Sequence, residues 1–129
     1  MIKGHTGSIT DVGFSPFVEQ LLASTSEDGT CKLWVIPEGG ISDHVKEFDG
    51  ELKGHTKKVL GLQWHRTADN VLATHAADST VRIWDVENQK QGMIYSGLNN
   101  FCTGMRWSPN GDRLAVVVKG GQIHCFDPR

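Results

Sequence analysis

The sequence predicts an all-β protein, and three observations carry this prediction. Short segments rich in β-branched and aromatic residues recur along the 129 residues, which is typical of strands. Several are followed by a tight-turn signal, such as Glu27-Asp28-Gly29 or Lys119-Gly120-Gly121. No segment shows the convincing periodic spacing of apolar residues that an amphipathic helix requires.

An internal repeat organises these segments. Gly4-His5-Thr6 returns as Gly54-His55-Thr56, and Trp34 returns as Trp84, both at a spacing of 50 residues. A third and more divergent copy follows at a spacing near 42, so that Phe126 stands where Trp84 stands in the second copy. We therefore divide the chain into a first repeat at 4–53, a second at 54–97 and a degenerate third at 98–129.

Each repeat begins with a strand signal. In these first strands an apolar residue lies two positions before an aromatic one, as in Val12 and Phe14 or Leu62 and Trp64, and such residues share one face of a strand. An apolar run, a turn and a further strand follow, and a weaker fourth strand ends the first two repeats. In chain order the predicted segments are 9–14, 21–23, 30–35, 46–52, 59–64, 71–73, 80–84, 91–96, 101–107, 114–118 and 122–126.

The amino-acid composition limits the classes of function that the chain is expected to have. A net charge of −2 gives no strongly basic surface for nucleic acid or for an anionic membrane. No apolar run approaches the length of a membrane span, about 20 residues. Cys31, Cys102 and Cys125 form no CxxC pair, and their odd number favours a reducing, intracellular setting over a disulfide framework. We therefore expect a cytoplasmic protein with no nucleic-acid partner and no membrane insertion.

The spacing from Gly54-His55 to Trp84-Asp85 resembles that of the WD repeat, the sequence unit of one class of β-propeller. The first repeat fits except that Val35 follows Trp34, where the family usually has aspartate. The third repeat lacks the Gly-His pair and has Phe126 in place of tryptophan. The resemblance covers the whole chain and implies a propeller of four-stranded blades, about three of which are present as an incomplete ring.

This resemblance implies a buried, hydrogen-bonded tetrad in each well-formed repeat. Its members would be His5, Ser24, Asp28 and Trp34 in the first repeat and His55, Thr74, Asp78 and Trp84 in the second. The residue types suit such a chain, because an indole N–H donates to a hydroxyl, the hydroxyl donates to an imidazole nitrogen, and the other imidazole nitrogen donates to a carboxylate. A closed chain leaves no buried polar group unpaired, and each orphan would cost roughly 1–3 kcal/mol.

Serine, histidine and aspartate together also permit a hydrolase interpretation. The set occurs twice, once with Thr74 in place of serine, and a GxSxG elbow accompanies neither copy. A catalytic site is needed once, whereas a structural element is needed in every repeat, so we predict structural residues and no enzyme activity. The remaining histidines and the cysteines lack the paired spacing of zinc ligands, so neither a metal site nor a cofactor is predicted.

Lys57 and Lys58 follow the second Gly-His-Thr and would lie in a loop on the propeller face that carries the tight turns. A basic pair in this place either is simply solvated or contacts an acidic partner. Arg106 and Lys119 are its candidate neighbours. These four residues form the candidate partner-binding set.

Three local details resemble the coronin branch of WD-repeat proteins. They are the loop Trp34-Val35-Ile36-Pro37-Glu38-Gly39-Gly40-Ile41, the ending Phe126-Asp127-Pro128-Arg129, and the order of a repeat with a long loop, a regular repeat and a degenerate one. Coronins are β-propellers that bind actin filaments and regulate their assembly. The resemblance therefore implies a non-catalytic, cytoskeleton-associated interaction scaffold, with actin filaments as the partner of the parent protein.

The alternative function is that of a WD-repeat scaffold subunit in another assembly, of the ubiquitin-ligase or RNA-processing type. In either case three repeats would not close a ring. We expect open sheet edges and apolar faces through which the isolated chain can self-associate, or an assembly of several copies into a ring.

Overall fold

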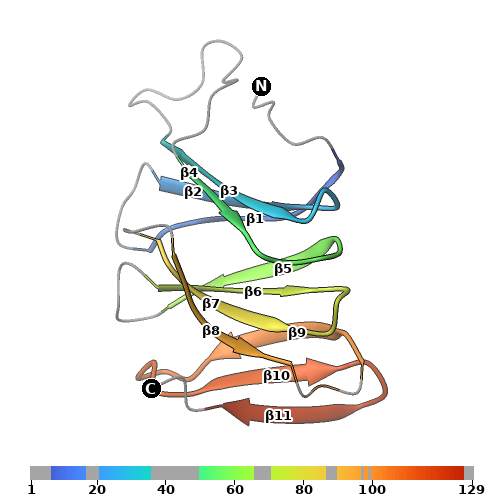
Figure 1. Ribbon diagram of the computed structural model, residues 1–129. Coiled ribbons are helices and arrows are strands. Elements are labelled where there is room, and N and C mark those ends of the chain that lie inside the picture. Colours follow the sequence, from blue (N-terminus) through green and yellow to red (C-terminus); the bar gives the residue numbers. More distant parts are fainter. Residues whose placement is uncertain are drawn as a thin grey trace.

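The computed structural model describes residues 7–16, 21–35, 50–65, 71–86, 90–96, 98 and 100–126. These residues form eleven β-strands in three antiparallel sheets, which stack from the N-terminal to the C-terminal end of the chain (Figure 1). The described residues contain no helix, and therefore none that is long and apolar enough to cross a membrane. The prediction of an all-β protein is confirmed.

Each sheet is a meander whose strands follow the order of the sequence. The first sheet contains β1 (Ile9–Phe14), β2 (Leu21–Ser26), β3 (Thr30–Val35) and β4 (Gly50–Lys53). The second contains β5 (Val59–Trp64), β6 (Val71–Ala76), β7 (Val81–Asp85) and β8 (Lys90–Tyr95). The third contains β9 (Cys102–Trp107), β10 (Leu114–Val118) and β11 (Gln122–Phe126).

The strand bounds follow the predicted segments closely. Segments 9–14, 30–35, 59–64, 114–118 and 122–126 coincide with strands of the structure. The second strands of the first two sheets extend beyond the predicted apolar runs to Ser26 and Ala76, because small and polar residues continue the extended backbone. Of the predicted segment 46–52, residues 46–49 lie outside the described residues. The division into repeats at 4–53, 54–97 and 98–129 stays a prediction.

Two apolar layers join the three sheets. The layer between the first and second sheets contains Ala23, Cys31, Leu33, Leu52, Leu62, Trp64, Leu72, Trp84 and Val86. The layer between the second and third sheets contains Ala73, Val81, Ile83, Leu98, Cys102, Trp107, Leu114, Val116 and Val118. The second sheet contributes to both layers because successive side chains of a strand point to opposite faces, as Leu72 and Ala73 do, both fully buried.

A tryptophan at the end of a first strand fastens each junction between sheets. Trp64 on β5 donates its indole N–H to the carbonyl oxygen of Gly13 on β1, at 3.0 Å. Trp107 on β9 makes the same bond to the carbonyl oxygen of Gln63 on β5, at 3.2 Å. Phe14 holds this position in the first sheet, and its side chain is 57% exposed. Among the described residues, no further sheet packs against Phe14.

Candidate functional site

The second sheet contains a continuous chain of hydrogen bonds through the four residues that the WD-repeat resemblance singled out. Trp84 Nε1 donates to the Thr74 hydroxyl oxygen at 2.8 Å. That oxygen lies 2.7 Å from His55 Nε2, and His55 Nδ1 lies 3.1 Å from Asp78 Oδ2. Because an ionised carboxylate only accepts and an indole only donates, the imidazole proton lies on Nδ1 and the Thr74 hydroxyl donates to Nε2.

Strand pairing explains why these residues meet. In the β6–β7 ladder Trp84 lies opposite Leu72, and Thr74 follows two residues further along β6, on the same face. Asp78 occupies the turn between these two strands, and His55 comes from the connection between β4 and β5. Trp84 from β7 and His55 from the β4–β5 connection thus meet at the buried hydroxyl of Thr74 on β6, and Asp78 is bonded to it through His55.

Asp78 also holds its own turn in shape. Its Oδ1 accepts the N–H and the hydroxyl of Thr80, at 3.1 and 2.5 Å, and its Oδ2 accepts the N–H of Thr56 at 3.0 Å. Burial opposes ionisation of Asp78, but these hydrogen bonds and the neighbouring His55 outweigh it, so the pKa of Asp78 lies below its usual value. Burial lowers the pKa of His55, although Asp78 acts in the opposite direction. The site therefore pairs a carboxylate with a neutral imidazole.

An arginine extends this network to the outer strand, and the repeat pattern alone assigned it no role. Arg82 Nη1 donates to Gln91 Oε1 on β8 at 2.5 Å, and Arg82 Nη2 lies 4.0 Å from Asp78 Oδ2. A Cβ atom at Gly54 would lie 2.7 Å from Arg82 Nη1 and 3.0 Å from the Trp84 ring. The glycine of the Gly-His pair is therefore needed for close packing against the network.

The first sheet contains the corresponding bond between tryptophan and hydroxyl. Trp34 Nε1 donates to Ser24 Oγ at 2.9 Å. Asp28, in the β2–β3 turn, accepts the N–H and the hydroxyl of Thr30 at 3.0 and 2.6 Å. His5, the fourth residue of this set, lies outside the described residues, so its place in a tetrad stays a prediction.

The third sheet replaces this network with apolar contact. Val116 and Phe126 stand 42 residues after Thr74 and Trp84, at the positions of the hydroxyl and the indole. Phe126 stacks on Tyr95 of β8, with ring centroids 3.9 Å apart. The described part of this sheet is thus held by packing at a place where the second sheet uses hydrogen bonds.

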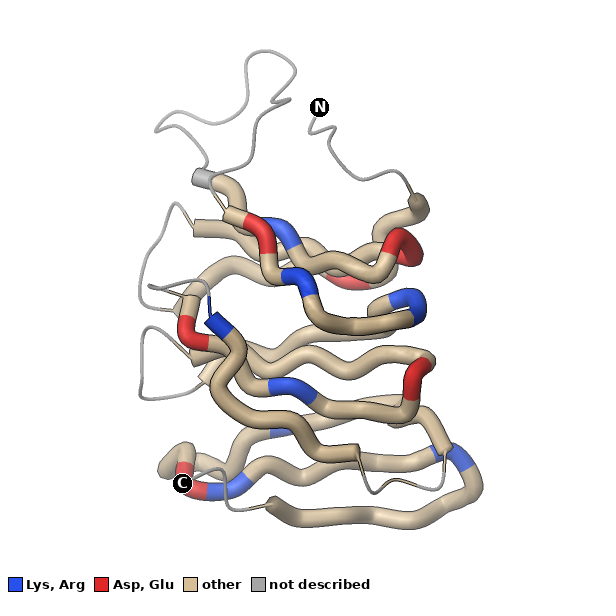
Figure 2. Tube along the Cα trace, viewed as in Figure 1, with Lys and Arg blue, Asp and Glu red and all other residues tan. Residues whose placement is uncertain are grey.

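Lys57 and Lys58 lie in the β4–β5 connection, and both side chains are exposed. The Lys58 carbonyl accepts the Ala77 N–H at 2.9 Å, and the Lys57 carbonyl oxygen lies 3.4 Å from the place of a Cβ on Gly29. The β2–β3, β6–β7 and β10–β11 turns lie along the same edge of the stack, at the right of Figure 1. Acidic and basic residues alternate along this edge in Figure 2. We call it the turn edge.

Of the other two candidate residues, Lys119 lies on the turn edge and Arg106 does not. The Lys119 N–H donates to the Phe101 carbonyl at 3.0 Å, and Lys119 Nζ lies 5.2 Å from the centre of the Phe101 ring. Arg106 lies opposite Ala115, near the end of β9 that leads into the β9–β10 connection. The structure thus places three lysines on the turn edge and the arginine toward the opposite one.

The hydroxyls of the two tryptophan–hydroxyl pairs are buried and hydrogen-bonded. Thr74 is fully buried and bonded on both sides, and Ser24 is 3% exposed and bonded to Trp34. No group of three His, Cys, Asp or Glu side chains with the arrangement of metal ligands occurs in the part of the chain that the structure describes. Burial raises the pKa of the free thiols Cys31 and Cys102. These groups therefore support packing rather than reactivity.

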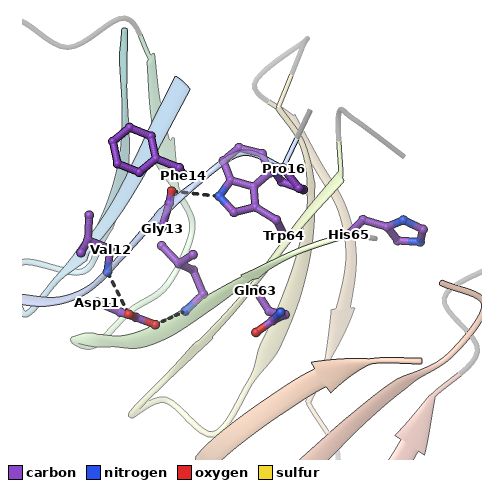
Figure 3. A pocket seen from close by; sticks show the side chains of 9 residues that line it. Asp11, Val12, Gly13, Phe14, Pro16, Gln63, Trp64 and His65 are labelled. Carbon is purple, nitrogen blue, oxygen red and sulfur yellow. Dashed lines mark hydrogen bonds between the residues drawn. The ribbon is translucent and has the colours of Figure 1, made fainter. Parts of the chain in front are cut away.

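A hollow between β1 and β5 is lined by Asp11, Val12, Gly13, Phe14, Pro16, Leu62, Gln63, Trp64 and His65 (Figure 3). Some of its polar groups already join the two sheets. Asp11 Oδ1 accepts the Val12 N–H at 2.8 Å, and Asp11 Oδ2 accepts the Leu62 N–H at 3.2 Å. Its single aspartate, which the sequence patterns did not point to, thus serves the junction between sheets.

His75 is buried at the second junction, a position that the sequence patterns also missed. It is 6% exposed, and its Nδ1 has no hydrogen-bond partner among the residues described. Burial lowers the pKa of His75 to about 4, although Asp11 acts in the opposite direction. A Cβ at Gly61 would lie 2.5 Å from His75 Nε2, so the glycine provides the room for the imidazole.

Comparison with known proteins agrees with this geometry. The family model described as WD domain, G-beta repeat matches residues 1–35 and 46–85. Coronin-A of Dictyostelium discoideum is 48% identical over 129 residues, which are 100% of this chain and 29% of the relative. Coronin-7 of Bos taurus is 35% identical over 122 residues, which are 95% of this chain and 13% of the relative.

A solved structure shows the same fold. The crystal structure of the WD40 domain from Toxoplasma gondii coronin matches with a TM-score of 0.92 and 35% sequence identity, over 98% of this chain and 33% of that chain. This chain therefore spans a third or less of the length of these proteins. The prediction of an incomplete, coronin-like WD-repeat propeller is confirmed.

Proposed function

This chain belongs to the WD40-repeat family, and from that premise we propose that it gives a coronin-like parent protein a non-catalytic surface for binding actin filaments in the cytoplasm. The observation that carries the proposal is the 48% identity with Coronin-A over the whole chain. The coronin resemblance implies actin association and a place at the cytoskeleton. The parent's activity as a whole rests on blades beyond the third or less that this chain spans.

The hydrogen-bond chain of the second sheet serves this function indirectly, by fixing a loop that a partner would touch. The connection from β4 to β5 begins with His55, which bonds Asp78, and continues with Thr56, whose N–H bonds the same carboxylate. Lys57 and Lys58 follow immediately, with exposed side chains. Rigid elements that present loops in this way are the usual basis of a binding rim.

Charge supports the choice of partner. The actin filament has an acidic surface, and three exposed lysines of this chain lie on the turn edge: Lys57, Lys58 and Lys119. The acidic residues on this edge are the exposed Glu27, the partly buried Asp28 and the buried Asp78. Such exposed charges act chiefly on the rate of encounter and on orientation, and salt screens them over about 10 Å. We therefore assign the turn edge to the partner.

The test is filament co-sedimentation of the full-length parent with the double substitution Lys57→Glu and Lys58→Glu. We expect weaker binding and a smaller further loss with added salt, because the attractive charges are already gone. The matched control is Lys90→Glu with Arg113→Glu, which makes the same change in net charge. Both control residues are exposed and lie beside connections on the opposite edge.

The fold should survive both pairs of substitutions, since none of the four side chains belongs to a tetrad. Undiminished co-sedimentation of the folded Lys57/Lys58 variant, or an equal loss in the control, would move the contact away from the turn edge. A failure of the parent to bind filaments at all would overturn the choice of actin as partner.

A further inference from the structure

The β6–β7 turn contains a serine in a backbone conformation that normally belongs to glycine. Ser79 has a φ of 62°, and no other non-glycine residue among those described has a positive φ. In this left-handed region the Cβ atom lies too close to the following carbonyl oxygen, a strain that glycine avoids because it has no Cβ. The turn therefore keeps a side chain at a cost to the stability of the fold.

The other two sheets show what the fold itself requires at this place. Gly29 stands 50 residues before Ser79, and Gly121 stands 42 residues after it, at the spacings of the repeat. The φ angles of these two glycines are 88° and 94°. In chain order, the three residues donate their N–H to the carbonyl oxygen three residues earlier, at 3.2, 3.2 and 3.1 Å. The turn is thus closed in the same way in each sheet, and glycine satisfies it in two of the three.

No contact within the described part of the chain offsets the strain at Ser79. The Ser79 hydroxyl forms no hydrogen bond with any residue that the structure describes, and the residue is partly exposed. The side chains on either side behave differently, because Asp78 and Thr80 are hydrogen-bonded to each other within the turn. Backbone strain that persists without a structural reason is typical of positions that serve binding or catalysis.

Ser79 lies beside the lysine pair of the turn edge. The β6–β7 turn is bonded to the connection that carries this pair at two points. Asp78 accepts the Thr56 N–H at 3.0 Å, and the N–H of the residue before Asp78 donates to the Lys58 carbonyl at 2.9 Å. Ser79 follows Asp78 directly, so the hydroxyl and the lysines belong to the same edge of the stack (Figure 1). A hydroxyl donor beside two ammonium groups suits a carboxylate, which accepts several hydrogen bonds at once.

We propose that Ser79 is a contact residue for the partner, and that its hydroxyl donates a hydrogen bond to a carboxylate that the lysine pair attracts. The inference rests on the proposed binding of actin filaments and names the chemistry that the turn edge would recognise, an acidic side chain. The lysines attract this group over a distance. A hydroxyl acts only at hydrogen-bond distance, so Ser79 determines where the carboxylate is held.

Two substitutions in the full-length parent test this role. Ser79→Gly removes the hydroxyl together with the backbone strain, whereas Ser79→Ala removes the hydroxyl and keeps the strain. We expect each variant to bind filaments about fivefold more weakly in co-sedimentation, the effect of one hydrogen bond. The urea midpoint of Ser79→Gly should be no lower than that of the unmodified protein. Gly121→Ser is the matched control for strain and should lower this midpoint, because a Cβ there meets no atom within 4 Å and only the backbone is affected.

These measurements separate the role of Ser79 from the proposed function. If the Lys57/Lys58 substitutions weaken filament binding but both Ser79 variants bind at full strength, the hydroxyl is not a contact and the proposal is overturned. A lower urea midpoint for Ser79→Gly would show that the serine serves the fold, and this result would overturn it as well. If the unmodified parent binds no filaments, the proposed function and the role of Ser79 are both refuted.

Discussion

Replacing Thr74 with valine removes one hydroxyl and leaves the shape of the side chain almost unchanged. The hydroxyl oxygen lies 2.8 Å from Trp84 Nε1 and 2.7 Å from His55 Nε2, and Thr74 is fully buried. Valine would therefore leave two buried nitrogen atoms without a partner and create no cavity. Each such group costs roughly 1–3 kcal/mol, so we expect the free energy of unfolding to fall by about 2–4 kcal/mol.

Urea unfolding of the chain, followed by tryptophan fluorescence, measures this loss. With a slope of about 1–3 kcal/mol per M, the midpoint should fall by roughly 1–2 M at an unchanged slope. Thr103→Val on β9 is the matched control, because the exposed Thr103 hydroxyl makes only a 3.3 Å bond to the Val117 carbonyl. Equal midpoint shifts for the two variants would refute the idea that the hydrogen-bond chain stabilises the second sheet.

Two further outcomes are expected. Trp84→Phe should lower the free energy of unfolding by about 1–3 kcal/mol, because it leaves the Thr74 hydroxyl without its donor. Phe126→Leu loses only apolar contact and should shift the denaturant midpoint less. Equal midpoint shifts for the two variants would count against the tetrad. The pKa of His75 is lowered from 6.5 to about 4, so the folded state resists protonation of this residue. The contribution of His75 to the free energy of unfolding is therefore full above about pH 6.5 and declines as the pH falls toward 4. His75→Gln keeps a donor but does not titrate, so its stability should decline less steeply over this window; parallel curves would show that His75 is not the sensitive group.

The strands could be predicted from the sequence because each has a local signal. A period of two, as in Val12 and Phe14, identifies a strand face, and the turn at Glu27-Asp28-Gly29 marks where a strand must end. The pairing of Trp84 with Thr74 was implied by the WD-repeat resemblance, and the residue types suit it because an indole N–H donates and a hydroxyl oxygen accepts. The strand signals are local to the sequence, whereas the tetrad depends on the resemblance to a family.

Contacts between sheets could not be predicted in the same way. Trp64 bonds the Gly13 carbonyl, and a backbone carbonyl has no signature in the sequence. The separation of Arg106 from Lys119 had a usable signal, because Arg106 stands near the end of a first strand and Lys119 follows a second one. Successive strands of a meander run in opposite directions, so these two positions fall on opposite edges.

The two junctions between sheets contain different side chains at equivalent places. At the first junction the Thr25 hydroxyl lies 2.8 Å from that of Thr10, which donates to the Val59 carbonyl at the start of β5, at 2.6 Å. At the second junction the equivalent residue is His75, which stands 50 residues after Thr25 and is 6% exposed. A buried imidazole thus takes the place of a hydroxyl.

The replacement of the Thr25 hydroxyl by the His75 imidazole makes the second junction sensitive to acid. The hydroxyl of Thr25 does not titrate, so the bridge at the first junction has the same charge at every pH. The imidazole of His75 fits beside Gly61 in its neutral form, with one ring nitrogen already lacking a partner, and a proton there would be buried without a counter-charge in contact. Burying such a charge costs far more than losing a hydrogen bond. Acid should therefore destabilise the buried His75 at the second junction, whereas the hydroxyls of Thr10 and Thr25 at the first junction do not titrate.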